Sequence, residues 1–345
     1  MSDIILQTVP LGLHWPTLDP FLFCAHHDDR YPPGNDHLGP DASIAGRNIG
    51  MDFEGIDGWR MYHGTVVPGF PQHPHRGFET ITYVREGICD HADSLGATAR
   101  FGEGDVQWLT AGAGIVHSEM LPLRQRDRAN PLELFQIWLN LPGTDKMSDP
   151  HFTMFWSEDI PRFRHVDESG RAVDVVVIAG SFGVVTALSP PPASWASRRD
   201  ADVAVWHLHF DAGTSIELPP ALSAETLRTL YVFDGDGVTI GSSRLDRDTG
   251  SVLRSDLPIR VESDRGAECL VLQGRPIGEP VAQQGPFVMN DEAGLRGAFL
   301  DYQRTGFGGW PWPVDGPVHD RDRGRFALHP DGRMETPGAT DIRSR

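Results

Sequence analysis

Short segments that alternate apolar and polar residues, separated by glycine and proline, run through most of this chain. The 345 residues include 38 glycines and 28 prolines, which disfavour long helices. Strands separated by turns at spacings of roughly 8 to 12 residues are typical of antiparallel barrels and sandwiches. Clear examples are Thr80 to Arg85, Asp105 to Leu109, Leu134 to Asn140, Val203 to Phe210 and Leu230 to Phe233. We therefore predict an all-β protein.

One segment near the carboxyl end has a helical rather than a strand pattern. Its apolar residues recur at helical spacing, and Asp291 and Glu292 stand in the first turn, where the helix dipole favours acids. We expect Asn290 to cap this helix. A weak internal repeat, seen in 66–87 and again in 209–235, further suggests two copies of one barrel.

The composition excludes several classes of function. A formal net charge of -18 disfavours direct binding to nucleic acid, because phosphates would be repelled. The longest clean apolar stretch, Val175 to Ala179, is far too short to cross a membrane, and the amino terminus lacks the pattern of a secretory signal. We therefore expect a cytoplasmic protein without a membrane partner. The three cysteines lie far apart, so any metal site must use nitrogen and oxygen ligands.

Two pairs of residues with a spacing of two carry the candidate chemistry. His73 and His75 stand at the start of a predicted strand, and His117 and Glu119 repeat the geometry. Since alternate residues of a strand share a face, each pair points to one side of its sheet. If both strands line one barrel, three imidazoles and a carboxylate converge on a site suited to Fe(II), Mn(II), Ni(II), Cu(II) or Zn(II).

The setting of these pairs is more informative than the pairs themselves, since a lone His-x-His is commonly a surface pair. Here a Pro68-Gly69 turn precedes the first pair, and a glycine-containing run, 110–116, leads into His117. This layout resembles the two cupin motifs, and more closely the pirin family within the cupins. The segments that carry the resemblance are HPHRGFETITYV (73–84), HADSLG (91–96), GDVQWLTAGAGIVHSE (104–119), QIWLNLP (136–142), LQGRPIGEPV (272–281) and GPFVMN (285–290).

The resemblance implies a bicupin, with two cupin-type antiparallel β-barrels and a short carboxy-terminal helix. We expect a metal-binding barrel in 1–165, with an inserted loop at about 25–60, and a barrel without metal in 166–288. A helix in 289–306 and an irregular tail in 307–345 would follow. The family's ligands fall on His73, His75, His117 and Glu119, with Fe(II) as the expected metal and Mn, Ni, Cu or Zn as alternatives.

The resemblance also implies an oxidoreductase of the quercetin 2,3-dioxygenase type, a quercetinase. Its substrates would be a small flavonol-like aromatic compound and O₂, with Glu119 acting as both ligand and general base. Two alternatives stay open. The first is an iron-dependent redox-sensing regulator that binds a protein partner, as a transcriptional or metabolic co-regulator. The second is a metal-stabilised barrel with neither activity.

Other polar residues near these motifs are expected outside the metal's ligand set. Glu79 stands where many cupins have a carboxylate ligand, but the pirin resemblance implies a hydrogen-bonding role near the site. His91 and Asp93 are interpreted as hydrogen-bonded loop residues. His207 and His209 precede their turn, whereas His73 and His75 follow theirs, so we interpret them as strand residues, one facing in and one out.

Overall fold

The computed structural model describes residues 4–338 and divides them into two compact units, each built from several stretches of chain. Barrel 1 contains His26–Gln136, Gly143–Asp159 and the described residues from Glu279 onward. Barrel 2 contains the described residues up to Ala25, Ile137–Pro142 and Ile160–Gly278. The predicted boundary after residue 165 assumed two consecutive segments, and it stays a prediction. Each unit is made of separate stretches of chain. Two long strands, β3 (Phe21–Tyr31) and β10 (Asn130–Asn140), contribute residues to both units.

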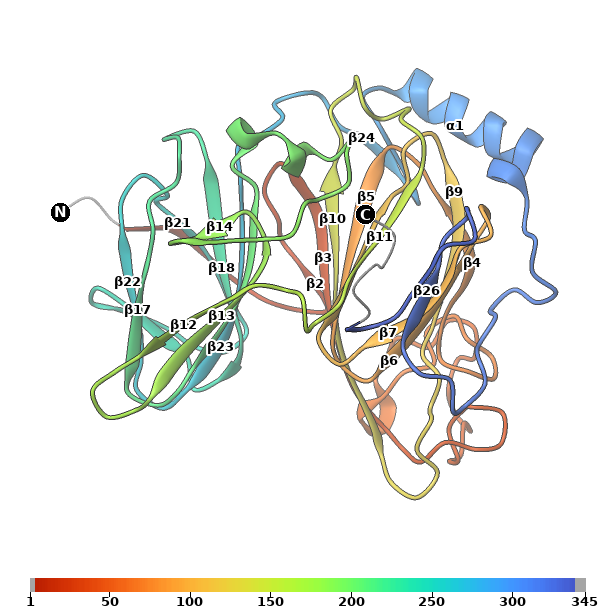
Figure 1. Cartoon of the computed structure of the whole chain (residues 1–345), viewed down its shortest axis with the longest axis horizontal. Helices are drawn as coiled ribbons and strands as arrows, with labels where there is room; N and C mark the ends of the chain where they lie inside the picture. Colours follow the sequence, from red (N-terminus) through yellow and green to blue (C-terminus); the bar gives the residue numbers. More distant parts are fainter. Residues whose placement is uncertain (1–3, 339–345) are drawn as a thin grey trace, which may run out of the picture. The chain divides into compact units, whose positions relative to one another are not determined.

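Two six-stranded sheets, with strand orders β11-β8-β5-β10-β3-β2 and β27-β26-β7-β6-β9-β4, supply the strands of barrel 1. The edge strand β2 (His14–Trp15) of the first sheet belongs to barrel 2, where it pairs with Cys24 and Ala25 of β3. Figure 1 shows the second of these sheets, with β4, β9, β6, β7 and β26 side by side. The strands assigned wholly to barrel 1 are β4 (Gly69–His75), β5 (Phe78–Glu86), β6 (Ile88–Asp93), β7 (Thr98–Gly102), β8 (Asp105–Thr110), β9 (Ile115–Met120), β11 (His151–Phe155), β24 (Ala282–Gln284), β25 (Phe287–Met289), β26 (Phe326–Leu328) and β27 (Met334–Glu335).

Barrel 2 has a seven-stranded sheet of order β1-β21-β18-β23-β16-β13-β12 and a four-stranded sheet of order β17-β22-β19-β20. Its elements are β1 (Ile5–Pro10), β2 (His14–Trp15), β12 (Arg162–Val166), β13 (Ala172–Ala179), β14 (Ser181–Phe182), β15 (Val185–Thr186), η2 (Trp195–Ser197), η3 (Arg199–Ala201), β16 (Ala204–Phe210), β17 (Thr214–Leu218), β18 (Leu227–Gly235), β19 (Val238–Ile240), β20 (Ser243–Leu245), β21 (Thr249–Leu253), β22 (Ile259–Ser263) and β23 (Ala267–Gly274). The prediction of an all-β bicupin is confirmed.

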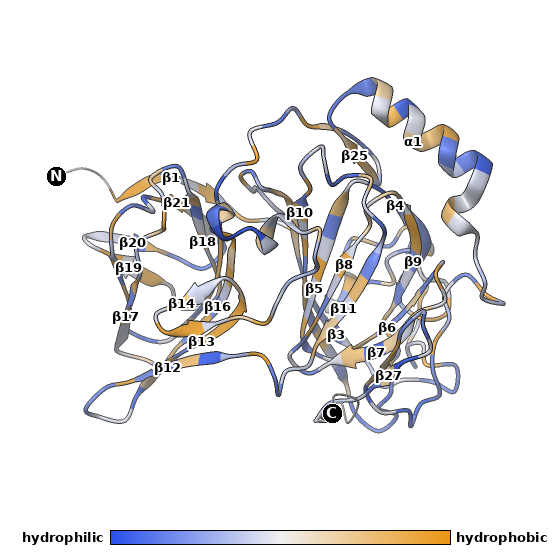
Figure 2. Cartoon of the chain, turned by 45° about the horizontal axis from the view of Figure 1, so that its top comes forward, coloured by the Kyte–Doolittle hydropathy of each residue, from blue (hydrophilic) through white to orange (hydrophobic). Residues whose placement is uncertain are grey.

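The expected carboxy-terminal helix is present as α1 (Glu292–Thr305). Its cap is Asp291, whose Oδ1 accepts a hydrogen bond from Gly294 N at 2.7 Å, so the prediction of Asn290 was wrong by one residue. Hydrophilic and hydrophobic residues alternate along α1 (Figure 2). Leu295 and Ala298 pack in a buried cluster of barrel 1 with Phe287 of β25. Within residues 4–338, no helix is both long and apolar enough to span a membrane.

The chain beyond residue 306 is more regular than expected. A short 3₁₀ turn, η4 (Gly306–Gly308), follows α1, and β26 later pairs antiparallel with β7, bringing Ala327 opposite Ala99. The unpaired edge of β7 accepts this extra strand because it offers free backbone hydrogen-bonding groups. Arg100 of β7 also donates hydrogen bonds to the carbonyl oxygens of His319, Asp320 and Arg323. Residues 307–338 of the tail are therefore part of barrel 1.

The predicted insertion is also tied into barrel 1. Residues 26–31 continue β3, and the chain beyond them is mostly irregular, with one 3₁₀ turn, η1 (Ile56–Gly58). Trp59, Met61 and Tyr62 are buried in the main apolar cluster of this unit. Tyr62 donates a hydrogen bond to Asp29 at 2.6 Å, which fixes the end of the insertion against β3.

Candidate metal centre

Strands β4 and β9 bring the two sequence motifs together. They pair antiparallel, with His73 opposite His117 and Phe70 opposite Glu119, and a β-bulge separates these two pairs. The strands approach closely at Gly69, where a Cβ would lie only 2.5 Å from the carbonyl oxygen of Glu119. Gly69 also has a φ of +132°, a conformation that favours glycine. The Pro68-Gly69 turn therefore sets the pairing that places the histidines.

Three histidines converge at this pairing. The ligand nitrogens of His73, His75 and His117 all lie within 4.8 Å of one another. The ring centroids are 4.4 Å apart for His73 and His117, 4.8 Å for His73 and His75, and 4.9 Å for His75 and His117. His117 is fully buried and His75 is nearly so. Three neutral imidazoles at this spacing can bind one divalent transition-metal ion.

The hydrogen bonds of these histidines fit a metal site. Nδ1 of His73 lies 2.8 Å from the carbonyl oxygen of Pro71, which leaves Nε2 free for a metal. Neither ring nitrogen of His117 has a hydrogen-bond partner within residues 4–338, although the side chain is buried. Leaving both nitrogens unsatisfied in the interior is costly, and metal binding by one of them would remove part of that cost.

The electrostatic setting keeps these side chains in the form that binds metals. Burial lowers the pKa of His73 to about 4, and burial together with the neighbouring histidines holds the pKa values of His75 and His117 well below the usual value. All three imidazoles are therefore neutral at physiological pH, with a lone pair available on each. The residues present fit a divalent metal.

Glu119 is near the histidines on β9 but is held by other groups. Its Oε1 accepts a hydrogen bond from Thr82 Oγ1 at 2.8 Å, and its Oε2 accepts one from Gln136 Nε2 at 2.7 Å. Burial raises the pKa of this carboxyl, and the two hydrogen bonds oppose that rise. The group of three ligand residues within 4.8 Å does not include Glu119, so its direct ligation stays a prediction. Sequence reasoning missed Thr82 and Gln136, whose contacts depend on strand pairing across the barrel.

Two further polar pairs lie close by. Glu79 is fully buried on β5 and accepts a hydrogen bond from Thr110 Oγ1 at 2.6 Å. His91 and Asp93 lie on β6, opposite Glu119 and His117, so their assignment to a loop was wrong. The alternation of HADS had been obscured by the turn residues that follow it. Both side chains are buried, and His91 Nε2 lies 3.2 Å from Asp93 Oδ2.

The histidines of barrel 2 lie in a different setting. His207 and His209 occupy alternate positions of β16, and both contact Glu268 of β23. Alternate residues of a regular strand share a face, so the expectation that one would point in and the other out was wrong. His207 is buried, whereas the side chain of His209 is 48% exposed.

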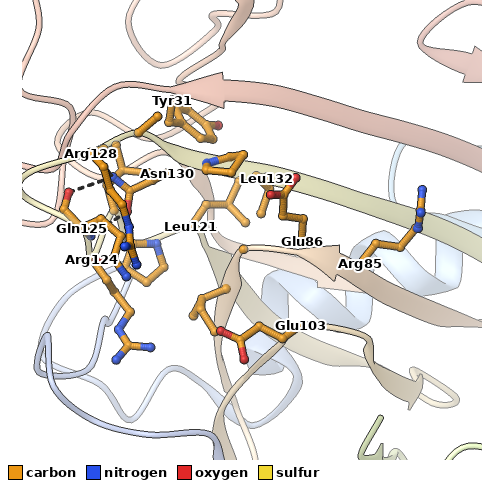
Figure 3. A pocket seen from close by; sticks show the side chains of 16 residues that line it. Tyr31, Arg85, Glu86, Glu103, Leu121, Arg124, Gln125, Arg128, Asn130 and Leu132 are labelled. Carbon is orange, nitrogen blue, oxygen red and sulfur yellow. Dashed lines mark hydrogen bonds between the residues drawn. The ribbon is translucent and has the colours of Figure 1, made fainter. Parts of the chain in front are cut away.

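A separate cavity of about 440 Å³ in barrel 1 is lined by residues of several strand ends (Figure 3). Arg124 and Arg128 line it together with Glu86 and Glu103, and Leu121 and Leu132 contribute apolar surface. Among the residues that the structure describes, none of the three histidines lines this cavity. We therefore do not assign this cavity to the metal centre.

Two antiparallel barrels and a histidine cluster define the chain as a bicupin that can hold a metal ion in barrel 1. The pirin family model matches residues 7–139, and the model of the pirin C-terminal cupin domain matches residues 205–308. A pirin-like protein of Caulobacter vibrioides is 40% identical over 239 residues, covering 69% of this chain and 80% of the relative. The chain belongs to the pirin family, which confirms the resemblance seen in the motifs.

Other similar proteins have names that refer to an activity. A Pseudomonas aeruginosa protein named "Putative quercetin 2,3-dioxygenase" is 37% identical over 246 residues, covering 69% of this chain and 79% of the relative. A crystal structure of quercetin 2,3-dioxygenase from Acinetobacter baumannii matches with a TM-score of 0.67 at 26% identity, covering 88% of this chain and 98% of that one.

Proposed function

We propose that this protein is a metal-dependent dioxygenase that cleaves the central ring of flavonol-like substrates, with Fe(II) as the metal. The observation that carries the proposal is the convergence of three neutral imidazoles, two of them buried and that of His73 half-buried, next to a buried carboxylate. The names of the Pseudomonas and Acinetobacter proteins support the substrate class. His73, His75 and His117 would hold the metal, and Glu119 would complete the site.

A bound divalent metal would supply a coordination position for the substrate oxygen and a redox-active centre for O₂. The protein's own contribution is to hold its ligands rigidly and to exclude water. Two of the three histidines are anchored through Nδ1, since His73 Nδ1 lies 2.8 Å from Pro71 O and His75 Nδ1 lies 3.4 Å from Pro286 O. Each of these rings is therefore oriented through its Nδ1 before the metal or substrate arrives.

Glu119 is the residue that would take the proton from the substrate hydroxyl. Its raised pKa makes the carboxylate a better proton acceptor than an exposed glutamate. Thr82 and Gln136 fix both carboxylate oxygens, so the base is oriented before substrate binds. In the overall reaction, O₂ adds both of its atoms to the flavonol, the central ring opens and one ring carbon leaves as carbon monoxide.

The test is anaerobic loading of the purified protein with Fe(II), Mn(II), Ni(II) or Cu(II), followed by quercetin and O₂. Loss of the flavonol absorbance should accompany release of one carbon monoxide per quercetin consumed. A His209→Ala variant, altered on an exposed strand position of barrel 2, is the matched control and should retain turnover. Absence of carbon monoxide with every metal would refute the proposed reaction.

A further inference from the structure

The cavity of about 440 Å³ in barrel 1 has both apolar and charged walls (Figure 3). Its volume is in the range of small-molecule sites. The buried side chains of Ile88, Leu121 and Leu132 belong to its lining and give it apolar surface. Several charged residues line it as well, and this mixture of apolar walls with a few polar groups is typical of ligand sites.

Two of the charged lining residues are already paired with neighbours. Arg85 Nη1 donates to both carboxylate oxygens of Glu133 at 2.9 Å, and Arg30 Nη1 donates to Glu86 Oε2 at 3.4 Å. Each of these pairs contributes a net charge close to zero. The charge that the cavity offers to a ligand therefore comes mainly from its other charged residues.

Three other charged lining residues, Glu103, Arg124 and Arg128, form no ion pair within the part of the chain that the structure describes. Arg124 is anchored through its Nε, which donates to the carbonyl oxygen of Arg321 at 2.8 Å, and this leaves its Nη groups for a ligand. Burial and the charge of Arg100 lower the pKa of Arg124, whereas the charge of Glu103 raises it. Glu103 is therefore close enough for its charge to act on Arg124 but too far away for an ion pair.

The two signs of charge lie on different sides of the cavity. In Figure 3, Arg124 and Arg128 lie at the left, and Glu86 and Glu103 lie farther to the right, beyond Leu121. A ligand between them meets guanidinium groups at one end and a carboxylate at the other. Such an arrangement favours a molecule that itself carries both charges, because each charge then has an opposite partner.

The backbone at Glu103 is unfavourable for a glutamate. Glu103 and Gly104 connect β7 to β8, and Glu103 has a φ of +54°, a left-handed conformation that suits glycine or asparagine better. Hydrogen bonds from Glu103 N to Gly87 O and from Gly104 N to Val84 O hold the turn in place. The fold therefore gains little from a glutamate side chain here, and a ligand accounts for its carboxylate better.

We propose that this cavity of barrel 1 binds a free α-amino acid with an apolar side chain. The carboxylate of the ligand accepts hydrogen bonds from Arg124 and Arg128, its ammonium group donates to Glu103, and its side chain packs against Leu121 and Leu132. A simple carboxylate is a poorer ligand, because Glu103 would repel it. The site is separate from the metal centre and does not rest on the dioxygenase proposal.

The experiment measures binding of three matched probes to the full-length, metal-loaded protein by isothermal titration calorimetry. The probes are L-phenylalanine, 3-phenylpropionate, which lacks the ammonium group, and L-phenylalaninamide, which lacks the carboxylate. Because hydrogen bonds to charged groups are the stronger kind, each analogue should bind roughly tenfold more weakly than phenylalanine, or worse. Arg124→Met should remove most of the preference over the amide, and Glu103→Asn should remove the preference over phenylpropionate.

Control variants separate binding from folding and locate the site. Glu103→Asn should melt no lower than the wild type, because asparagine tolerates the left-handed conformation, yet it should bind phenylalanine about tenfold more weakly. Arg126→Met removes an exposed arginine of the same loop that pairs with Asp36 outside the cavity lining, and it should leave the affinity unchanged. His117→Ala, which disables the metal centre, should leave the affinity unchanged as well.

Three results would overturn the inference. The first is no binding of phenylalanine at millimolar concentration, and the second is equal affinity for the three probes in the wild-type protein. The third is unaltered phenylalanine binding by Glu103→Asn, which decides the matter even if Arg124→Met fails to fold. Loss of phenylalanine binding in His117→Ala would place the ligand at the metal centre and would also contradict the proposed site.

Discussion

The two barrels are both antiparallel but fill their interiors differently. In barrel 1, neighbouring strands bring three histidines together beside a buried glutamate. In barrel 2, the main buried cluster is formed mostly by valine, leucine and aromatic residues of strands such as β13 and β16, including Val175 and Leu208. The contrast teaches that this scaffold is stable with either interior, so the side chains of a few paired positions decide which barrel carries chemistry.

The largest effect on activity is expected when the carboxylate of Glu119 in barrel 1 is replaced by a neutral amide. Glu119→Gln keeps the three histidines and therefore the metal, but it removes the proton acceptor, so kcat should fall about 10² to 10⁴-fold. Steady-state quercetin turnover and elemental analysis of the same samples measure both quantities. Glu79→Gln, the matched change at a second buried carboxylate, should alter turnover only slightly. Equal losses in the two variants would contradict the assigned role.

The interior of barrel 2 should respond to mutation through stability rather than chemistry. Leu208 is fully buried, so Leu208→Ala should lower the free energy of unfolding by about 2 to 5 kcal/mol. Metal content and kcat should stay near the wild-type values at low temperature. Chemical denaturation followed by fluorescence measures the effect, with Val184→Ala at a 95% exposed position as the control. A loss of metal on Leu208→Ala would show that the barrels are not functionally distinct.

The metal-free protein should lose stability in acid through the histidines of the metal centre. The pKa of His73 is about 4 when folded and near 6.5 as a free side chain, so between these values the unfolded chain binds the proton and the folded chain does not. As pH falls from 6.5 toward 4, the free energy of unfolding of the wild type should therefore decrease relative to that of a His73→Gln variant. The expected change in this difference is on the order of 3 kcal/mol. Burial raises the pKa values of the carboxyls of Asp29 and Asp105 to about 6. These two groups titrate in both proteins, so their contributions cancel in the difference between the two free energies of unfolding. A constant difference across this range would contradict the prediction.

A smaller loss of activity is expected when the hydrogen bond that orients Glu119 is removed. Thr82→Val keeps the shape of the side chain but removes the hydroxyl that bonds to Oε1. Because a hydrogen bond to a charged group contributes about 1.5 to 3 kcal/mol, kcat should fall roughly tenfold with little change in KM or metal content. Thr82→Ser, which restores the hydroxyl, should recover most of the activity. Failure of serine to restore kcat would indicate a packing role instead.

The sequence allowed the β-class, the two barrels and the family to be predicted, because alternation and glycine-bounded motifs are local signals. It also identified the three histidines that converge. The contacts of Glu119 with Thr82 and Gln136 could not be predicted, because they join residues of different strands whose pairing is set by the whole fold. The strand β26 was missed for a similar reason, since only the edge of β7 makes that short segment extended.

The central claim is that one metal ion binds at the histidines of barrel 1. It is tested most directly by loading the metal-free protein anaerobically with Fe(II), removing excess iron and measuring iron per chain in the wild type, His117→Ala and His209→Ala. We expect one iron per chain in the wild type and in His209→Ala, and almost none in His117→Ala. Retention of iron by His117→Ala, or its loss from His209→Ala, would contradict the account.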